Sequence, residues 1–215
     1  MKKLAVLWAL PLLVLLWLKG QGSLTIQRLT VDPSALAGVP PWTGLLSNAG
    51  VLLWFSSATV LLFVARTRPG ARRVVLLPGL LSLVLGLDDG LMLHEELLPS
   101  LAGVHYTVMQ PALYILYAAL LGLSLRGLRS QLRGDSCVVL LAAIFCLGGS
   151  VAVDMLLDSH LLSERNSLVL DEGLAMWLED GLKLLGIVAW WGYWTDLSAR
   201  LEQVIALDFE QGGPG

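Results

Sequence analysis

The sequence predicts an all-α fold, a polytopic transmembrane helical bundle of a single domain. Of the 215 residues, 56% are hydrophobic and 14% are charged, whereas soluble domains carry about 25% charged residues. Apolar runs of roughly 20 residues, the length that crosses a hydrocarbon core about 30 Å thick, recur along the chain. Lys and Arg concentrate in alternate connections between these runs, as they do in membrane bundles. No connection is long enough to form a separate soluble domain.

Six membrane spans are expected. They cover about residues 4–18, 44–65, 74–97, 104–125, 136–158 and 172–195. The first span follows Met1-Lys2-Lys3 and precedes Lys19, with no small-residue cleavage site, which favours an uncleaved anchor over the alternative of a cleaved signal peptide. Residues 196–215 are expected to form a short amphipathic cytoplasmic helix and a tail.

The distribution of Lys and Arg predicts that both termini lie in the cytoplasm (N-in/C-in). In this orientation three basic residues fall in outer connections, namely Lys19, Arg28 and Arg165, and ten fall in cytoplasmic ones. The positive-inside rule assigns the basic connections to the cytoplasmic side. The protein is therefore expected in the cell inner (cytoplasmic) membrane. Trp190, Trp191 and Trp194 would close the last span as an aromatic belt.

Composition also bears on partners. No basic patch indicates nucleic acid, and no nucleotide, haem or phosphate motif is present. Cys137 and Cys146 lie on one predicted helix, roughly 13 Å apart, which is too far for a disulfide. Membrane lipid is the expected partner, and a partner membrane subunit is a further option.

Acidic residues gather in three of the predicted spans. Ten of the seventeen Asp and Glu residues lie within the third, fifth and sixth spans or at their outer ends. At 100° per residue they form one polar stripe per helix. The stripes consist of Asp88 with Glu95, of Ser150 with Asp154 and Asp158, and of Glu172 with Glu179 and Lys183. In lipid such stripes are expected to face one another or a wet cavity.

The assigned orientation puts these acids on one side of the membrane. Asp89 and Glu179 would each lie roughly 12 Å below the outer end of their helix. The three histidines, His94, His105 and His160, would all lie at outer helix ends. These positions predict a single site in the outer half of the bundle, where Lys183 alone cannot neutralise the carboxylates, so that protonation, water or a bound cation must do so.

Carboxylates with imidazoles are ligands suited to Zn, Fe or Mn, so a divalent metal is the expected cofactor. The expected metal ligands are Asp89, His94, Glu95, Asp154, Asp158 and Glu179. Asp88 is the expected catalytic base, acting on metal-bound water. Residues expected to support these ligands or to form ion pairs are Lys183, Asp180, Glu172, Tyr106, Gln110 and His105. A structural ion pair between Glu179 and Lys183 is an alternative, and the Tyr106, Tyr114, Tyr117 series is expected to serve packing.

An LDD-x4-HE segment, Leu87 to Glu95, is followed by an LED-x2-K segment, Leu178 to Lys183. This pairing resembles a group of uncharacterised bacterial multipass membrane proteins over spans three to six, and it implies no activity. The second segment is also similar to the EE-x2-K box of glutamate-type intramembrane proteases, but the other motifs of those families are absent. The paired HxxxH of alkaline ceramidase-like hydrolases is absent as well.

Three functions follow as hypotheses. The first is a metal-dependent membrane enzyme, a hydrolase or oxidoreductase acting on a lipid or a small periplasm-facing substrate. The second is a proton or cation pathway, which the scarcity of polar residues in the inner half disfavours. The third is a non-catalytic subunit or assembly factor of a membrane complex, with the polar stripes facing a partner helix.

Overall fold

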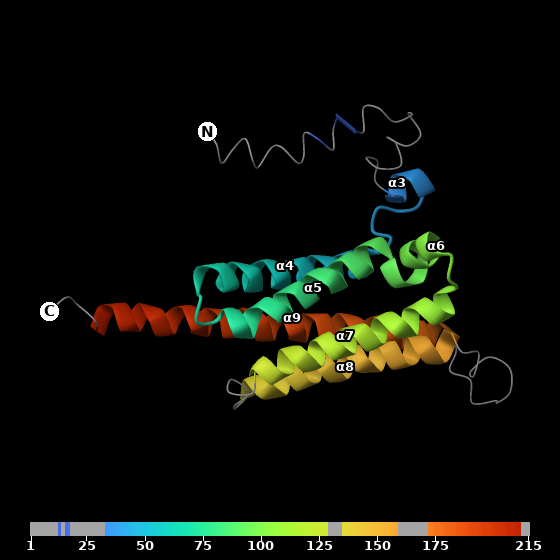
Figure 1. Ribbon diagram of the computed structural model, residues 1–215. Helices are drawn as coiled ribbons and strands as arrows, with labels where there is room; N and C mark the ends of the chain where they lie inside the picture. The colour runs from blue at the N-terminus through green and yellow to red at the C-terminus, as the bar shows by residue number, and fades with distance from the viewer. Residues whose placement is uncertain (1–12, 14–15, 18–32, 129–134, 159–171, 212–215) are drawn as a thin grey trace. The chain divides into compact units, whose positions relative to one another are not determined.

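The computed structural model describes residues 13, 16–17, 33–128, 135–158 and 172–211, and every element in these ranges is a helix (Figure 1). The chain divides into two compact units, residues 1–45 and 46–215, each of which is considered by itself. The first unit contains the short helix α3, Pro33–Ala37. The predicted first span, 4–18, lies almost wholly outside the described residues.

The second unit is the helical bundle. Its elements are α4 (Leu45–Thr67), α5 (Arg72–Leu91), η1 (Leu93–Leu97), α6 (Leu98–Ala102), α7 (Tyr106–Leu128), α8 (Asp135–Asp158) and α9 (Glu172–Gln211). Four helical segments are long and apolar enough to cross a membrane, and they are Leu45–Thr67, Arg72–Leu91, Tyr106–Leu128 and Cys137–Leu156. The predicted all-α class is confirmed for the described residues, and these four segments correspond to the second to fifth predicted spans.

The third predicted span, 74–97, is interrupted near its end. Helix α5 stops at Leu91, and Met92 adopts a left-handed conformation with φ 50° and ψ 48°. A single π-helical turn, η1, follows. A positive φ at a residue other than glycine is uncommon, and here the Asp88 side chain stabilises the turn by accepting a hydrogen bond from the backbone N–H of His94 at 3.0 Å.

Helix α9 is one continuous element of 40 residues. At 1.5 Å per residue it is about 60 Å long, roughly twice the thickness of a hydrocarbon core. The predicted sixth span, 172–195, and the predicted cytoplasmic helix that starts at residue 196 are therefore parts of the same helix. No proline interrupts the sequence from 172 to 211, so the helix has no residue that would force a break.

The core contains tryptophans that the sequence predicts to lie in an interfacial belt. Trp190 and Trp194 are 2% and 0% exposed, so the belt assignment is wrong for both. Trp190 packs edge-on against Trp54, with ring centroids 5.9 Å apart, and its Nε1 donates a hydrogen bond to Ser82 Oγ at 2.9 Å. This polar partner allows the Trp190 indole to be buried, whereas the buried Nε1 of Trp194 has no hydrogen-bond partner among the described residues. Trp191 stays exposed.

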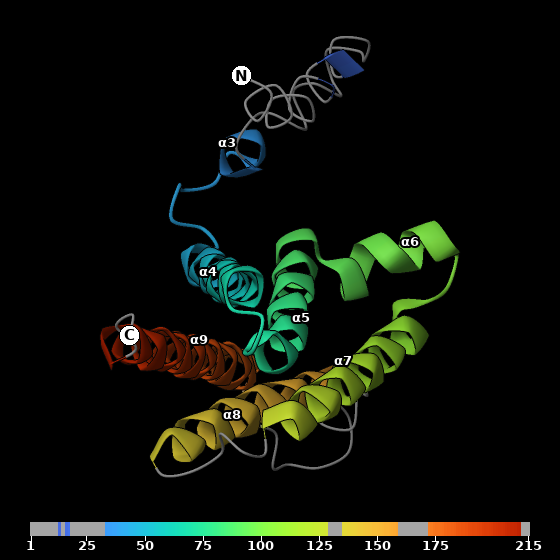
Figure 2. The same ribbon diagram turned by 60° about the vertical axis from the view of Figure 1, so that its left-hand side comes forward.

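The helices pack most closely in two pairs, α8 with α9 and α5 with α7. Figure 2 shows α7 also lying beside α8. Glycines permit two of the close approaches. A Cβ at Gly86 would lie 3.0 Å from Cβ of Trp54 on α4, and one at Gly186 would lie 2.7 Å from Cγ of Leu147 on α8. Small residues of this kind let membrane helices approach closely.

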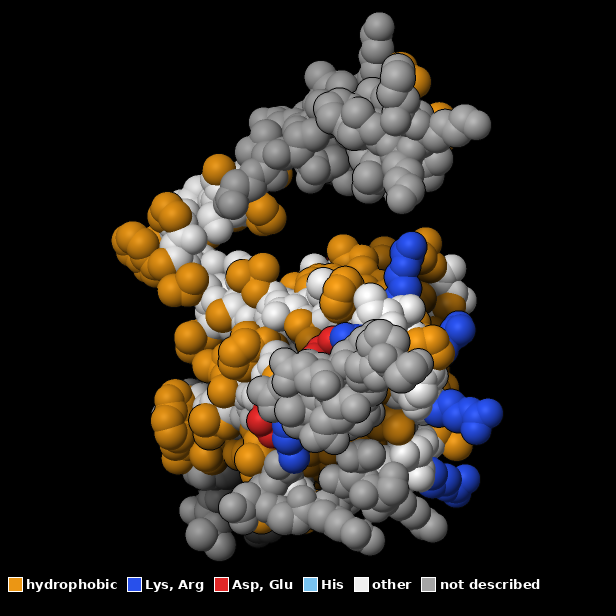
Figure 3. Space-filling model, turned by 90° about the vertical axis from the view of Figure 1, so that its left-hand side faces the viewer, with side chains coloured by type: hydrophobic (Ala, Val, Ile, Leu, Met, Phe, Trp, Pro, Cys, Tyr) orange, Lys and Arg blue, Asp and Glu red, His pale blue; other side chains and the backbone are white. Residues whose placement is uncertain are grey.

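One end of the bundle is rich in arginine. The described arginines at this end lie in or beside the α4–α5 connection, at the end of α7, and in the far part of α9. They are Arg66, Arg68, Arg72, Arg73, Arg126 and Arg200. Figure 3 faces this end, and blue side chains project along one edge of it. Arg68 Nε donates to Glu202 Oε2 at 2.9 Å, and this hydrogen bonding raises the pKa of Arg68 and lowers that of the Glu202 carboxyl. The pair links α9 to the α4–α5 connection.

The contact at Gly186 leads to a stability prediction. Gly186→Ala should lower the melting temperature in detergent, because the new Cβ would overlap Leu147, including its backbone nitrogen at 3.0 Å. Overpacking of this kind costs about 1–3 kcal/mol. Gly181→Ala on the same helix is the control, since its Cβ meets nothing within 4 Å. Equal melting temperatures for the two variants would contradict the packing described for α8 and α9.

Candidate functional site

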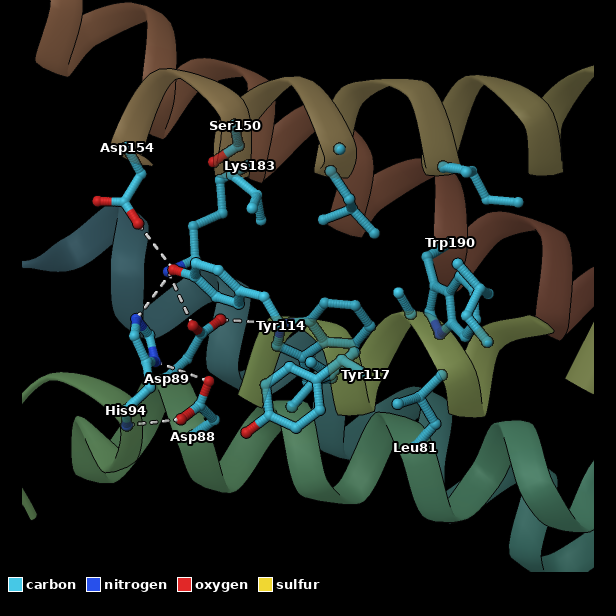
Figure 4. Close-up of a pocket in the computed structure, with 18 of the residues that line it drawn as sticks. Leu81, Asp88, Asp89, His94, Tyr114, Tyr117, Ser150, Asp154, Lys183 and Trp190 are labelled. Carbon is cyan, nitrogen blue, oxygen red and sulfur yellow. Dashed lines mark hydrogen bonds and ion pairs between the residues drawn. The ribbon is translucent and has the colours of Figure 1, made fainter. Parts of the chain in front are cut away.

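A cavity of about 370 Å³ lies among α4, α5, η1, α7, α8 and α9 (Figure 4). Its wall is polar at one end. The polar lining residues are Asp88, Asp89, His94, Glu95, Tyr114, Tyr117, Ser150, Asp154, Glu179 and Lys183. Elsewhere the wall is apolar, with Leu81 and Trp190 lying well away from the carboxylates in Figure 4. The cavity thus offers a charged end and a hydrophobic end to one ligand.

Asp88 and His94 form a buried pair at the polar end. The side chains of Asp88 and His94 are 4% and 7% exposed, and Asp88 Oδ2 lies 2.8 Å from Nδ1 of the imidazole. The other carboxylate oxygen accepts the backbone N–H of His94. The interruption of α5 at Met92 is what turns His94 back toward Asp88. The carboxylate therefore fixes both the backbone and the ring orientation of His94.

A chain of hydrogen bonds continues from His94 to two other helices. His94 Nε2 lies 3.1 Å from the Tyr114 hydroxyl on α7. That hydroxyl donates to Asp154 Oδ2 on α8 at 2.7 Å, and Gln110 Nε2 donates to the same carboxylate oxygen at 2.6 Å. Asp88, His94, Tyr114 and Asp154 therefore form one continuous series that joins α5, η1, α7 and α8.

The donors and acceptors around His94 favour a doubly protonated ring. Nδ1 faces the Asp88 carboxylate, which only accepts. Nε2 faces the Tyr114 oxygen, whose hydrogen is directed to Asp154, and also lies 3.3 Å from Glu95 Oε1. Only an imidazolium can donate at both nitrogens. Glu95 is half exposed, so it connects this ring to the surface.

Asp89 has separate partners. Its Oδ1 lies 2.7 Å from Lys183 Nζ on α9, and its Oδ2 accepts a hydrogen bond from Trp54 Nε1 at 2.9 Å. The ion pair of Lys183 is this cross-helix pair with Asp89, and not the alternative pair with Glu179 on the same helix. A cation beside a carboxylate that is 11% exposed offsets part of the cost of placing that carboxylate in the bundle.

Most of the predicted site residues meet in the cavity. Those that line it are Asp88, Asp89, His94, Glu95, Asp154, Glu179 and Lys183, and buried Gln110 joins them through Asp154. Tyr106, His105 and Asp180 are exposed and do not line it. His105 instead bonds Thr107 and packs on Tyr106. The side chains of Asp158 and Glu172, and all of His160, lie outside the described part of the chain.

The described residues contain no group of three or more His, Cys, Asp and Glu side chains arranged to hold a metal ion. The carboxylates of Asp88, Asp89 and Asp154 are directed to protein donors. Asp88, predicted to be a base, lies behind His94 as its hydrogen-bond acceptor. A zinc, iron or manganese site stays a prediction.

Two site residues were missed or misjudged from the sequence. Tyr114 was assigned to packing, yet its hydroxyl connects His94 to Asp154. Its position four residues after Gln110 places both on one helical face, which was the available signal. Trp54 was not singled out, and its place in the middle of an apolar span, away from either interface, was the corresponding signal.

The chain belongs to a protein family defined by a domain of unknown function (DUF8692), whose model matches residues 4–197. No curated protein and no solved structure matches the chain. The predicted membership of an uncharacterised group is therefore confirmed, and the assignment of a function depends on the site itself.

The Asp89–Lys183 pair leads to a second prediction. Lys183→Met should destabilise the protein by about 3 kcal/mol, the lower end for a buried ion pair that loses one partner, since Lys183 is 35% exposed. The double variant Asp89→Asn with Lys183→Met should recover most of this loss, because no unpaired charge remains. Unfolding free energies measured in mixed micelles would test the cycle. Additive losses in the double variant would contradict the pairing.

Proposed function

We propose that this protein is a membrane-embedded enzyme that uses His94 for proton transfer to or from an amphipathic, lipid-like substrate held in the cavity. One observation carries the proposal, namely the continuous series Asp88–His94–Tyr114–Asp154 along the wall of a cavity that is otherwise largely apolar. A titratable histidine, oriented by a buried carboxylate and facing a ligand-sized cavity, is a typical acid–base arrangement.

In this proposal Asp88 is a positioning residue. It holds the Nδ1 proton and stabilises the imidazolium, while Nε2 is the atom that gives a proton to the substrate or takes one from it. Glu95, which is half exposed and 3.3 Å from Nε2, returns the proton to solvent. Tyr114 and Asp154 hold the opposite side of the site. Proton transfer by a positioned group contributes about 10²–10⁴-fold to a rate.

The geometry gives less support to a transmembrane ion pathway. The hydrogen-bonded series runs from helix to helix at one end of the bundle. Beyond the apolar end of the cavity, the described core contains tightly buried side chains such as Leu61 and Trp194. The buried serines Ser57 and Ser82 donate to backbone carbonyls of their own helices, whereas an ion route would need polar groups available to the ion through this layer.

A purely structural role as a partner subunit also gains less support. Among the described residues, Asp89 of α5 pairs with Lys183 of α9, and Asp154 of α8 accepts hydrogen bonds from Tyr114 and Gln110. A partner helix is therefore not required to satisfy these two carboxylates. Buried polar groups that are satisfied internally leave the cavity available for a ligand.

We further propose six spans with both termini in the cytoplasm of a cell with an inner membrane, and a site that opens on the outer side. The argument is the accumulation of arginines at the end of the bundle opposite to Asp88 and His94. The positive-inside rule assigns that end to the cytoplasm.

The enzymatic proposal predicts a loss of turnover in His94→Gln. Proteoliposomes containing extracted membrane lipids would be incubated with the wild type or a variant and their lipids compared by mass spectrometry. The wild type should convert at least one lipid-like species, and His94→Gln and Asp88→Asn should slow this conversion by about 10²–10⁴-fold. His105→Gln is the matched control, because His105 is an exposed histidine outside the cavity.

Elemental analysis of the same preparations separates this mechanism from the metal-dependent one. Acid–base chemistry on His94 predicts turnover without stoichiometric zinc, iron or manganese. One metal per chain, lost in His94→Gln and Asp89→Asn, would instead support the metal-dependent enzyme. Equal conversion by wild type and His94→Gln would reject His94 as the reacting group.

The orientation is tested by cysteine labelling in a background without Cys137 and Cys146. Ser100→Cys lies at the site end and Gly70→Cys at the arginine-rich end, and both positions are exposed. A membrane-impermeant maleimide added to intact cells should label Ser100→Cys, and should label Gly70→Cys only after the membrane is opened. The reverse pattern would invert the topology.

A further inference from the structure

We propose that the cavity takes a single-chain amphipathic amine from the bilayer, and that its hydrocarbon tail enters sideways between α7 and α8, past Ala118 and Gly148. This inference deepens the proposed function and rests on the same cavity. It names the class of substrate and the side from which it arrives.

The exposure of the lining residues locates the openings. Of the residues that line the cavity, three are exposed, and they are Glu95, Ala118 and Gly148. Glu95 belongs to the polar end, beside His94. Ala118 and Gly148 have almost no side chain, and a Cβ built on Gly148 would meet no atom within 4 Å. The wall of the cavity therefore reaches the molecular surface at both of these places, and in this proposal each of them is an opening.

The second opening lies at the depth of the lipid tails. Ala118 is twelve residues into α7, and Gly148 is ten residues before the end of α8, about 18 Å and 15 Å along helices that span a core of roughly 30 Å. Tyr114 donates a hydrogen bond to Asp154 across the antiparallel pair α7 and α8. Counted from this bond, Ala118 and Gly148 differ in height along the helix axes by less than about one turn. At this depth only hydrocarbon is present to enter.

The cavity beyond this opening suits one apolar chain. Its apolar lining includes Leu81, Leu121, Ile144, Leu147 and Trp190. A volume of about 370 Å³ equals roughly a dozen water-sized volumes of about 30 Å³, near the lower limit for small-molecule sites. This room holds a small head and part of a single chain, whereas a phospholipid with two chains is too large.

The charge at the polar end selects the head group. Five carboxylates line the cavity, and they are Asp88, Asp89, Glu95, Asp154 and Glu179. The cationic side chains among the lining residues are His94, when protonated, and Lys183, which pairs with Asp89. Asp154 accepts hydrogen bonds from two neutral donors, Tyr114 and Gln110. The excess of negative charge attracts an amine and repels a phosphate or carboxylate.

Photo-crosslinking tests the inference directly. The purified protein would be placed in phosphatidylcholine vesicles with a long-chain alkylamine that carries a diazirine near the middle of its chain. Crosslinks on Leu81 and Trp190 are the informative ones, because these residues are 3% and 2% exposed and a lipid outside the bundle cannot reach them. A matched alcohol should crosslink less and a matched carboxylate least.

Two glycine variants test the route. Gly148→Trp should abolish crosslinks to Leu81 and Trp190 by filling the opening. Gly122→Trp on α7 should leave them unchanged, because Gly122 is also exposed with nothing within 4 Å of a Cβ but does not line the cavity. Crosslinks that persist in Gly148→Trp would overturn the lateral route, and equal labelling by amine and carboxylate would overturn the head-group assignment.

The crosslinking experiment and the lipid-conversion assay can succeed or fail independently of each other. His94→Gln should keep the crosslinks, since the tail does not depend on proton transfer. Crosslinks in Leu81 and Trp190 without any conversion of lipid would support this inference and reject the enzyme. Conversion that depends on His94, with no crosslink to either buried residue from any of the three probes, would support the enzyme and overturn this inference.

Discussion

The structure depends on one constraint, that a carboxylate in the hydrocarbon region must find its partner inside the bundle. An unpaired charge there costs on the order of 2.5–3.5 kcal/mol on insertion scales. Asp89 meets this constraint with Lys183 and Trp54, and these contacts join α5 to α9 and α4. Asp88 meets it locally, by binding both the backbone and the ring of His94. The same carboxylate thereby stabilises the turn at Met92 and fixes the orientation of the His94 ring.

These polar links also explain why a cavity exists. The close pairs in the bundle are α8 with α9 and α5 with α7. Between the two pairs, Tyr114 and Gln110 of α7 donate hydrogen bonds to Asp154 of α8. The apolar side chains that line the rest of the cavity do not fill the space between the helices. Charged contacts hold the helices at one end, and packing of Trp190 and Trp194 holds them at the other. The cavity lies between the two.

Hydrophobic length and charge pattern were sufficient to predict the helical class, the second to fifth spans and the acids that share one end. They could not predict which groups pair, because 100° per residue gives the face of a helix but no distance between helices. Lys183 illustrates this. A pair with Glu179 four residues away is worth a few tenths of a kcal/mol, whereas a bond to the more buried Asp89 relieves a larger cost. The sequence also does not predict the turn at Met92, because this turn depends on the hydrogen bond between the Asp88 side chain and the backbone N–H of His94.

A reaction on a membrane amphiphile needs two supplies that do not mix, protons from water and a hydrocarbon chain from the bilayer. The cavity has one exposed lining residue next to His94, which is Glu95, and two in the middle of α7 and α8, which are Ala118 and Gly148. In the arrangement that we propose, water reaches the first and lipid tails reach the second, so the two supplies would meet only at the polar end, where Nε2 of His94 lies. A carboxylate-rich end at the surface and an apolar opening at mid-depth are therefore parts of one arrangement, and each would have little use without the other.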